Sequence, residues 1–224
     1  EVSFLFNAQL LGHKKIVIKA IEKKDLGIIV APPGSGKTIV GLKIIADKKQ
    51  PALIITHRKQ IADQWIERIE TFLGIPKNEI GKIGQGKTKI GKQITVAMIQ
   101  SLSKELEKPD TGKILNAFGT IIVDECHHIP AETFRNAISK LQTFYLYGLT
   151  ATPFRKYNDS KLIFIHLGEV IAEIKSNEIS TSKRPKIIIR NTELDVPFNS
   201  KTDKFETLSK ILVHDSSRNK SILG

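Results

Sequence analysis

The chain has 224 residues, which fits one large domain or one domain with part of a second. Lys and Arg number 35 against 23 acidic residues, a formal net charge of +12. This balance favours a polyanionic partner, nucleic acid before membrane, with a merely basic protein as the alternative. The sequence contains no apolar run of the roughly 18 residues that could span a bilayer, and the first seven residues do not resemble a secretory leader.

The single cysteine, Cys126, excludes an internal disulfide and suits a reducing compartment, so we expect a cytoplasmic protein without a membrane partner. Because the chain begins at Glu1 and not at Met, we also expect it to be a piece of a longer protein.

A phosphate-binding loop is predicted between an apolar strand at 26–30 and a helix that begins near residue 37. Its sequence is Ala31-Pro32-Pro33-Gly34-Ser35-Gly36-Lys37-Thr38, which matches G-x-x-x-x-G-K-[ST] except for Ala31 in place of the first Gly. The glycines allow backbone N–H groups to turn toward an anion at the positive end of the helix. Lys37 would contact the outer phosphates, and Thr38 would offer its hydroxyl to Mg²⁺. The predicted nucleotide-binding residues are Pro33, Gly34, Ser35, Gly36, Lys37 and Thr38; a glycine-rich loop without a ligand is the alternative.

The remaining elements alternate along the chain. Apolar runs predict strands at 52–56, 94–98, 120–124 and 145–149. Helical periodicity predicts helices at 12–24, 59–73, 101–107, from Pro130 onward, and at 205–213. Residues 81–93, rich in Gly and Lys, are expected to form a loop or loose hairpin outside the core. Further strands are expected at 162–165 and 186–189, separated by a polar linker at 176–184. The pattern predicts an α/β fold with a mainly parallel sheet and helices on both faces.

Polar residues follow two of the predicted strands directly. Asp124 could hold Mg²⁺, and Glu125 could orient or deprotonate the water that attacks a γ-phosphate. Zinc held by Cys126 and the two neighbouring histidines is a weaker alternative, because adjacent residues cannot all face one ion. Thr150 and Thr152, after the next strand, could relay hydrogen bonds from the acidic site to a neighbouring surface.

Together these motifs resemble the first RecA-like motor domain of superfamily 2 helicases, the DEAD/DEAH-box-like group. More closely, they are similar to the branch of DNA repair helicases and restriction translocases. The resemblance rests on residues 31–38, Asp124-Glu125-Cys126-His127 and Thr150-Ala151-Thr152, supported by motif Ia-like residues 56–65 and motif Ic-like residues 96–102. It covers residues 12 to about 155, so we expect a motor domain at 1–155. Residues 156–224 are expected to be a linker and the truncated start of a second motor domain.

The resemblance implies ATP hydrolysis with Mg²⁺, coupled to movement on nucleic acid, DNA more than RNA. Lys37, Asp124, Glu125 and His127 would be catalytic, and Thr38 with Asp124 would hold the metal. Arg58, Gln100 and Ser101 would lie on the nucleic-acid backbone, while Thr150 and Thr152 would couple the two sites. The second motor domain of the parent chain would be a partner and would complete the ATP site with arginines.

The chain departs from the family pattern at Lys14, where the family often has a Gln that reads adenine. Three alternatives stay open at this point. The parent protein could act on RNA, the domain could be a nucleotide-gated binding module without turnover, and Lys87, Lys89 and Lys92 could form either added backbone contacts or a plain solvated hairpin.

Overall fold

The computed structural model describes residues 2–8, 14–128, 131–152, 165–175, 205–216 and 219–220. The chain divides into two compact units, Glu1–Ser180 and Thr181–Gly224. The second unit contains α8 (Phe205–His214), whose bounds differ by one residue from those of the helix predicted at 205–213. The first unit contains all the sheet and all the predicted site residues.

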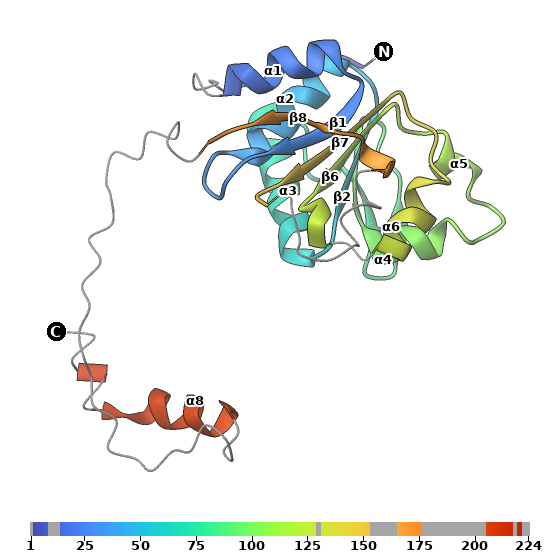
Figure 1. The fold of residues 1–224 in the computed structure, drawn as a ribbon. Coiled ribbons are helices and arrows are strands. Elements are labelled where there is room, and N and C mark those ends of the chain that lie inside the picture. The colour runs from blue at the N-terminus through green and yellow to red at the C-terminus, as the bar shows by residue number, and fades with distance from the viewer. Residues whose placement is uncertain are drawn as a thin grey trace. The chain divides into compact units, whose positions relative to one another are not determined.

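The first unit is built on one eight-stranded sheet whose strands run in the order β4-β3-β5-β2-β6-β7-β1-β8 (Figure 1). All neighbours pair in parallel except β3 and β4, which form an antiparallel hairpin. The strands are β1 (Leu26–Val30), β2 (Ala52–Thr56), β3 (Gly81–Gly84), β4 (Lys87–Lys89), β5 (Ile94–Met98), β6 (Thr120–Asp124), β7 (Tyr145–Thr150) and β8 (Val170–Glu173). The predicted α/β class with a mainly parallel sheet is confirmed.

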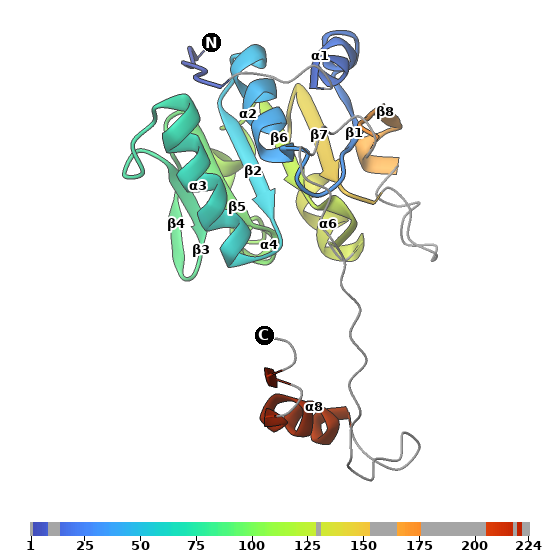
Figure 2. The same ribbon diagram turned by 90° about the vertical axis from the view of Figure 1, so that its left-hand side faces the viewer.

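Helices cover both faces of the sheet, as Figures 1 and 2 show. Alternate strand residues belong to two separate buried clusters, since successive side chains of a strand point to opposite faces. One cluster packs beneath α1 (Lys14–Lys23), α2 (Lys37–Lys48) and α3 (Lys59–Leu73). The other packs beneath α4 (Ile99–Glu105), α5 (Gly112–Leu115) and α6 (Ala131–Ile138). The central strands are therefore apolar on both faces, which is why they are continuous hydrophobic runs.

β8 pairs with β1 and lengthens the sheet beyond residue 155, within the first unit. Two expectations need correction. The glycine- and lysine-rich stretch at 81–93 is a hairpin, but β3 belongs to the core, where Ile83 is fully buried against α4. Residue 165, expected to end a strand, begins a short helical turn. The rest of that strand and the one at 186–189 lie outside the described residues.

The strand order places the functional segments along one edge of the sheet. The carboxyl ends of β1, β7 and β6 are neighbours, followed by those of β2, β5 and β3. The first three strands lead into the phosphate loop, Thr150 and the acidic pair. The next three lead into Arg58, Gln100 and the hairpin turn. In open parallel sheets ligands bind at this edge, so both halves of it are candidates for function.

Candidate nucleotide and nucleic-acid site

The phosphate loop leaves β1 and turns into α2 through two glycines in the left-handed region. Gly34 has φ of 79° and Gly36 has φ of 82°, a conformation that side chains with a Cβ rarely adopt. Ser35, between them, is 2% exposed, and its Oγ has no hydrogen-bond partner among the described residues. A buried hydroxyl without a partner is costly unless a ligand satisfies it. The loop thus has the backbone and the unsatisfied polar group that suit a phosphate.

Ala31 explains how the loop tolerates the missing first glycine. Ala31 is fully buried, and its N–H donates to the carbonyl of Thr150 at 2.8 Å. The Cβ of alanine fits in this closed position, and the hydrogen bond fixes the loop's start against the end of β7. The departure from the phosphate-loop pattern is therefore accommodated by packing.

Asp124 lies at the end of β6 with both carboxylate oxygens engaged. Trp65 donates its indole N–H to Oδ2 at 2.7 Å, and the backbone N–H of Glu125 donates to Oδ1 at 2.9 Å. The side chain is 7% exposed. Burial raises the pKa of Asp124, although the Trp65 hydrogen bond opposes the shift.

Glu125 turns the chain out of the sheet and reaches the phosphate loop. Its φ of 47° is in the left-handed region, unusual for a residue with a Cβ. Its Oε1 lies 2.7 Å from Lys37 Nζ. Burial acts to raise the pKa of Glu125, but the hydrogen bond and the charge of Lys37 outweigh it, so the net shift is downward. Lys37 and Glu125, both assigned above to the same ATP site, are therefore in direct contact in the structure.

His127 and Thr150 connect Glu125 to the end of β7. Thr150 Oγ1 is 2.6 Å from His127 Nδ1, which lies 3.3 Å from Glu125 Oε2. Thr150 Oγ1 also donates to the carbonyl of Thr152 at 2.9 Å, and the N–H of Ala151 approaches Glu125 Oε2 at 3.4 Å. A continuous series of polar contacts therefore runs from Glu125 through His127 to Thr150 and Thr152.

Trp65 is a site residue that the sequence does not single out, since it lies on the apolar face of α3 and at the end of the motif Ia-like stretch. It is 1% exposed, and a Cβ added to Gly41 of α2 would lie 2.6 Å from its ring. A buried tryptophan N–H needs an acceptor, and this chain has one tryptophan. That requirement was the available signal. Trp65 links α3, α2 and Asp124.

The oxygen donors of Asp124 and Thr38 suit Mg²⁺, which prefers hard oxygen ligands and retains part of its water shell. The zinc alternative is not supported by the thiol, since burial raises the pKa of Cys126 to about 12. Within the described residues, no group of three or more His, Cys, Asp or Glu could hold a metal ion.

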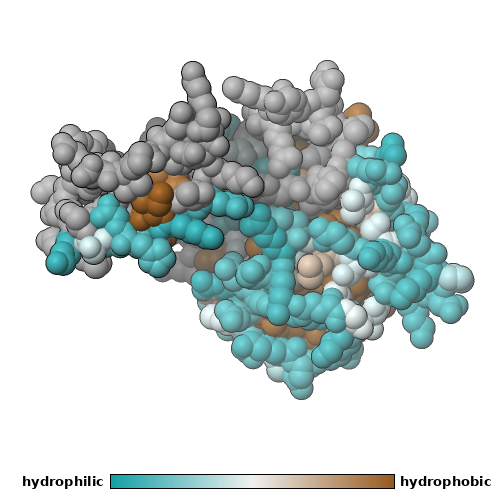
Figure 3. Space-filling view, turned by 90° about the horizontal axis from the view of Figure 1, so that it is seen from below, coloured by the Kyte–Doolittle hydropathy of each residue, from teal (hydrophilic) through white to brown (hydrophobic). Residues whose placement is uncertain are grey.

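The predicted nucleic-acid residues lie after two neighbouring strands. Arg58 follows β2, is exposed, and immediately precedes the first turn of α3. Gln100 and Ser101 lie in the first turn of α4, directly after β5, which pairs with β2 along its length. Figure 2 shows the carboxyl end of β2 and the start of α3 at the lower end of the first unit, with α4 nearby. Seen from below, the described surface is mostly hydrophilic (Figure 3).

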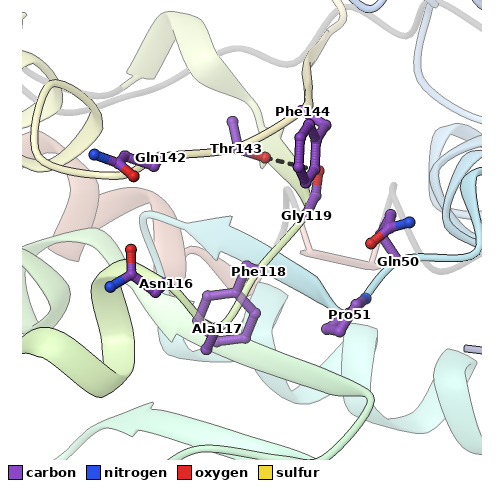
Figure 4. A pocket seen from close by; sticks show the side chains of 9 residues that line it. All are labelled: Gln50, Pro51, Asn116, Ala117, Phe118, Gly119, Gln142, Thr143 and Phe144. Carbon is purple, nitrogen blue, oxygen red and sulfur yellow. Dashed lines mark hydrogen bonds between the residues drawn. The ribbon is translucent and has the colours of Figure 1, made fainter. Parts of the chain in front are cut away.

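A pocket of about 440 Å³ lies at the opposite edge of the sheet, away from these residues (Figure 4). Its walls come from the segments that precede β2, β6 and β7, and they include Gln50, Asn116 and Phe144. No charged side chain is among its described lining residues. This pocket is therefore not part of the phosphate-loop site, which lies at the carboxyl edge.

The family model described as "Type III restriction enzyme, res subunit" matches residues 5–155. The chain belongs to this family, and its first unit is the first RecA-like motor domain of a superfamily 2 helicase. No helix among the described residues is long and apolar enough to cross a membrane.

Three relatives illustrate the family. "DNA 3'-5' translocase XPB2" of Sulfurisphaera tokodaii is 31% identical over 91% of this chain and 44% of its own length. "Putative ATP-dependent RNA helicase L396" of Acanthamoeba polyphaga mimivirus is 31% identical over 88% of this chain and 40% of its own length. "Probable helicase D10" of Escherichia phage T5 is 36% identical over 60% of this chain and 28% of its own length. The chain thus spans less than half of each relative.

Solved structures share the fold. The UvsW helicase of bacteriophage T4 matches with a TM-score of 0.60 at 19% identity, over 77% of this chain and 64% of that one. The Sulfolobus solfataricus SWI2/SNF2 ATPase core, solved with double-stranded DNA, matches with a TM-score of 0.57 at 18% identity, over 75% and 37%.

Proposed function

We propose that this chain binds ATP with Mg²⁺ and is the nucleotide-binding motor domain of an ATP-driven DNA translocase or helicase. The 2.7 Å approach of Lys37 to Glu125 is the observation that carries the proposal. It joins a phosphate loop to a candidate water-activating carboxylate across the ends of two strands. Both groups are mostly buried, where electrostatic interactions are stronger than in open water.

Each residue has a role in the proposed reaction. Lys37 and the N–H groups around Gly34 and Gly36 would bind the β- and γ-phosphates. Thr38 and Asp124 would hold Mg²⁺, which supplies positive charge against the phosphate oxygens when bound. The triphosphate would replace Glu125 as the partner of Lys37.

Once Lys37 is engaged by phosphate, Glu125 is available to orient a water toward the γ-phosphorus. A bond forms between the water oxygen and the γ-phosphorus, and the bond to the β–γ bridging oxygen breaks. Glu125 accepts the water's proton, and ADP and phosphate leave. His127 and Thr150 would transmit the state of Glu125 toward Thr152 and the nucleic-acid side of the edge.

We further propose DNA as the track, contacted on its backbone by Arg58, Gln100 and Ser101. The S. tokodaii relative is named as a DNA translocase and supports this choice. Contacts to phosphates would hold the strand without reading its sequence. The second motor domain of the parent chain would supply the arginines that complete catalysis, so this chain alone should hydrolyse ATP slowly.

The test compares wild type, Lys37→Ala, Glu125→Gln and the control Lys43→Ala, which removes a lysine from the same helix outside the loop. Titration of a fluorescent ATP analogue with Mg²⁺ should show binding lost in Lys37→Ala and retained in Glu125→Gln and Lys43→Ala. Turnover, measured in the full-length parent protein, should fall about 10²- to 10⁴-fold in Glu125→Gln. Unchanged turnover there would refute the enzymatic proposal in favour of a nucleotide-gated binding module.

RNA is the second candidate track, and it is favoured by the mimivirus relative named as an RNA helicase. Stimulation of full-length ATPase activity by DNA and by RNA of the same sequence separates the two. Stronger stimulation by RNA would replace DNA in the proposal and leave the nucleotide site unaffected.

A further inference from the structure

A groove of about 480 Å³ opens between the turn of the β3–β4 hairpin and α4; we call it the hairpin groove. Its lining includes Lys87, Ser101, Lys104, Lys108, Glu105 and Gly86. Three lysines against one glutamate make it positively charged. None of the described residues that line the groove is an aromatic or an apolar residue with a side chain.

The position of the groove follows from the sheet. β3 runs parallel to β5, so the hairpin turn leaves the sheet at the same edge as Arg58 and Gln100. Ser101 belongs both to the predicted nucleic-acid contacts and to the groove. Two strand spacings separate the ends of β2 and β3, about 10 Å. One strand of a duplex carries one phosphate about every 3.4 Å of helix axis, so a duplex whose axis runs along this edge would place about three phosphates of one strand over the span.

Two of the lysines are available for a new anion. Lys108 pairs with Glu105 at 2.6 Å. Lys87 and Lys104 have no acidic partner within ion-pair distance among the residues that the structure describes. Ser101 and Lys104 are three residues apart and therefore lie on the same side of α4. Gly86, with φ of 73°, leaves the tip of the turn without a side chain, so an extended ligand can approach the backbone.

We propose that the hairpin groove binds backbone phosphates of the same DNA strand that Arg58 and Ser101 contact, lengthening the track by two lysine contacts. This inference rests on the proposed DNA-binding function. The occupant is phosphate and not a base, because base binding without sequence preference uses aromatic stacking, which the lining lacks. The contact is accordingly independent of sequence.

The experiment measures the salt dependence of DNA binding by this chain. Fluorescence anisotropy follows the binding of one fluorescein-labelled single-stranded DNA at several salt concentrations. The proteins compared are wild type, the groove variant Lys87→Ala/Lys104→Ala and the control Lys19→Ala/Lys23→Ala. Lys19 and Lys23 are exposed on α1, so the control removes equal charge from another surface. Lys87→Arg/Lys104→Arg keeps the charge in the groove.

Each phosphate lost on a single strand lowers the slope of log K against log salt by about 0.7, so we expect the groove variant to lose about 1.4. The control and the arginine variant should retain the wild-type slope. Far-UV circular dichroism confirms that all variants are folded.

Two failures are distinguishable. If Arg58→Ala weakens binding and the groove variant matches the control, the groove is a solvated hairpin and this inference is wrong while the proposed function stands. If wild type itself shows no salt-dependent binding to DNA, the proposed DNA track fails and the groove proposal fails with it.

Discussion

Replacing Trp65 with Phe removes one N–H group from the buried carboxylate of Asp124. The hydrogen bond is 2.7 Å long, and both groups are nearly inaccessible to water. Hydrogen bonds to charged groups contribute roughly 1.5–3 kcal/mol. The smaller ring also leaves a void beside Gly41, which adds roughly 1 kcal/mol. We therefore expect the free energy of unfolding at pH 7 to fall by roughly 3 kcal/mol.

Tyr147→Phe is the matched control. Tyr147 is also a fully buried aromatic residue, and its hydroxyl donates at 2.7 Å to the carbonyl of Lys24, an uncharged acceptor. Its removal should reduce stability by about 1 kcal/mol, the contribution of a neutral hydrogen bond. Urea unfolding followed by circular dichroism suits both variants, because Trp65→Phe leaves the chain without tryptophan fluorescence.

The pH dependence separates the lost hydrogen bond from lost packing. Because the folded-state pKa of Asp124 is raised above 3.8, its contribution to stability declines as pH rises from that value through the folded pKa. Removing the indole donor raises this pKa further, so the decline should be steeper and extend to higher pH in Trp65→Phe. Tyr147→Phe should run parallel to wild type. If both variants lose equal stability with parallel pH profiles, Trp65 only fills space and the reasoning is wrong.

Three more perturbations test the site. In wild type, the ionised Glu125 contributes roughly 1 kcal/mol of stability above pH 4.5, and this contribution is lost as pH falls through the lowered folded-state pKa. Glu125→Gln should lack this contribution and its pH dependence, which urea unfolding between pH 6 and 3 measures. Gly41→Ala should cost roughly 1–3 kcal/mol, since its Cβ would lie 2.6 Å from the Trp65 ring; an unchanged urea midpoint would contradict this packing. Thr150→Val should lower stability by about 1 kcal/mol or more, because valine removes the hydroxyl that hydrogen-bonds with His127 and Thr152. Thr150→Ser is the control, and equal melting temperatures would show that these contacts contribute nothing.

The local elements of the site follow from short stretches of the sequence. The apolar run at 26–30, the glycines of the loop and Lys37 predicted a strand, a glycine turn and a helix, and the structure has them at those positions. The helix at 59–73 and the strands at 52–56, 94–98 and 120–124 have the predicted bounds. These features are local, because period and turn chemistry depend on residues close in the chain.

Which of these elements are neighbours depends on the packing of the whole fold. Periodicity says that a strand is buried, but not that β7 lies between β1 and β6, the arrangement that brings Thr150, Lys37 and Glu125 together. For the same reason, the sequence does not predict the hydrogen bond between Trp65 and Asp124, which are 59 residues apart. Strand pairing and long-range hydrogen bonds are chosen by the packing of the whole core, which no single segment encodes.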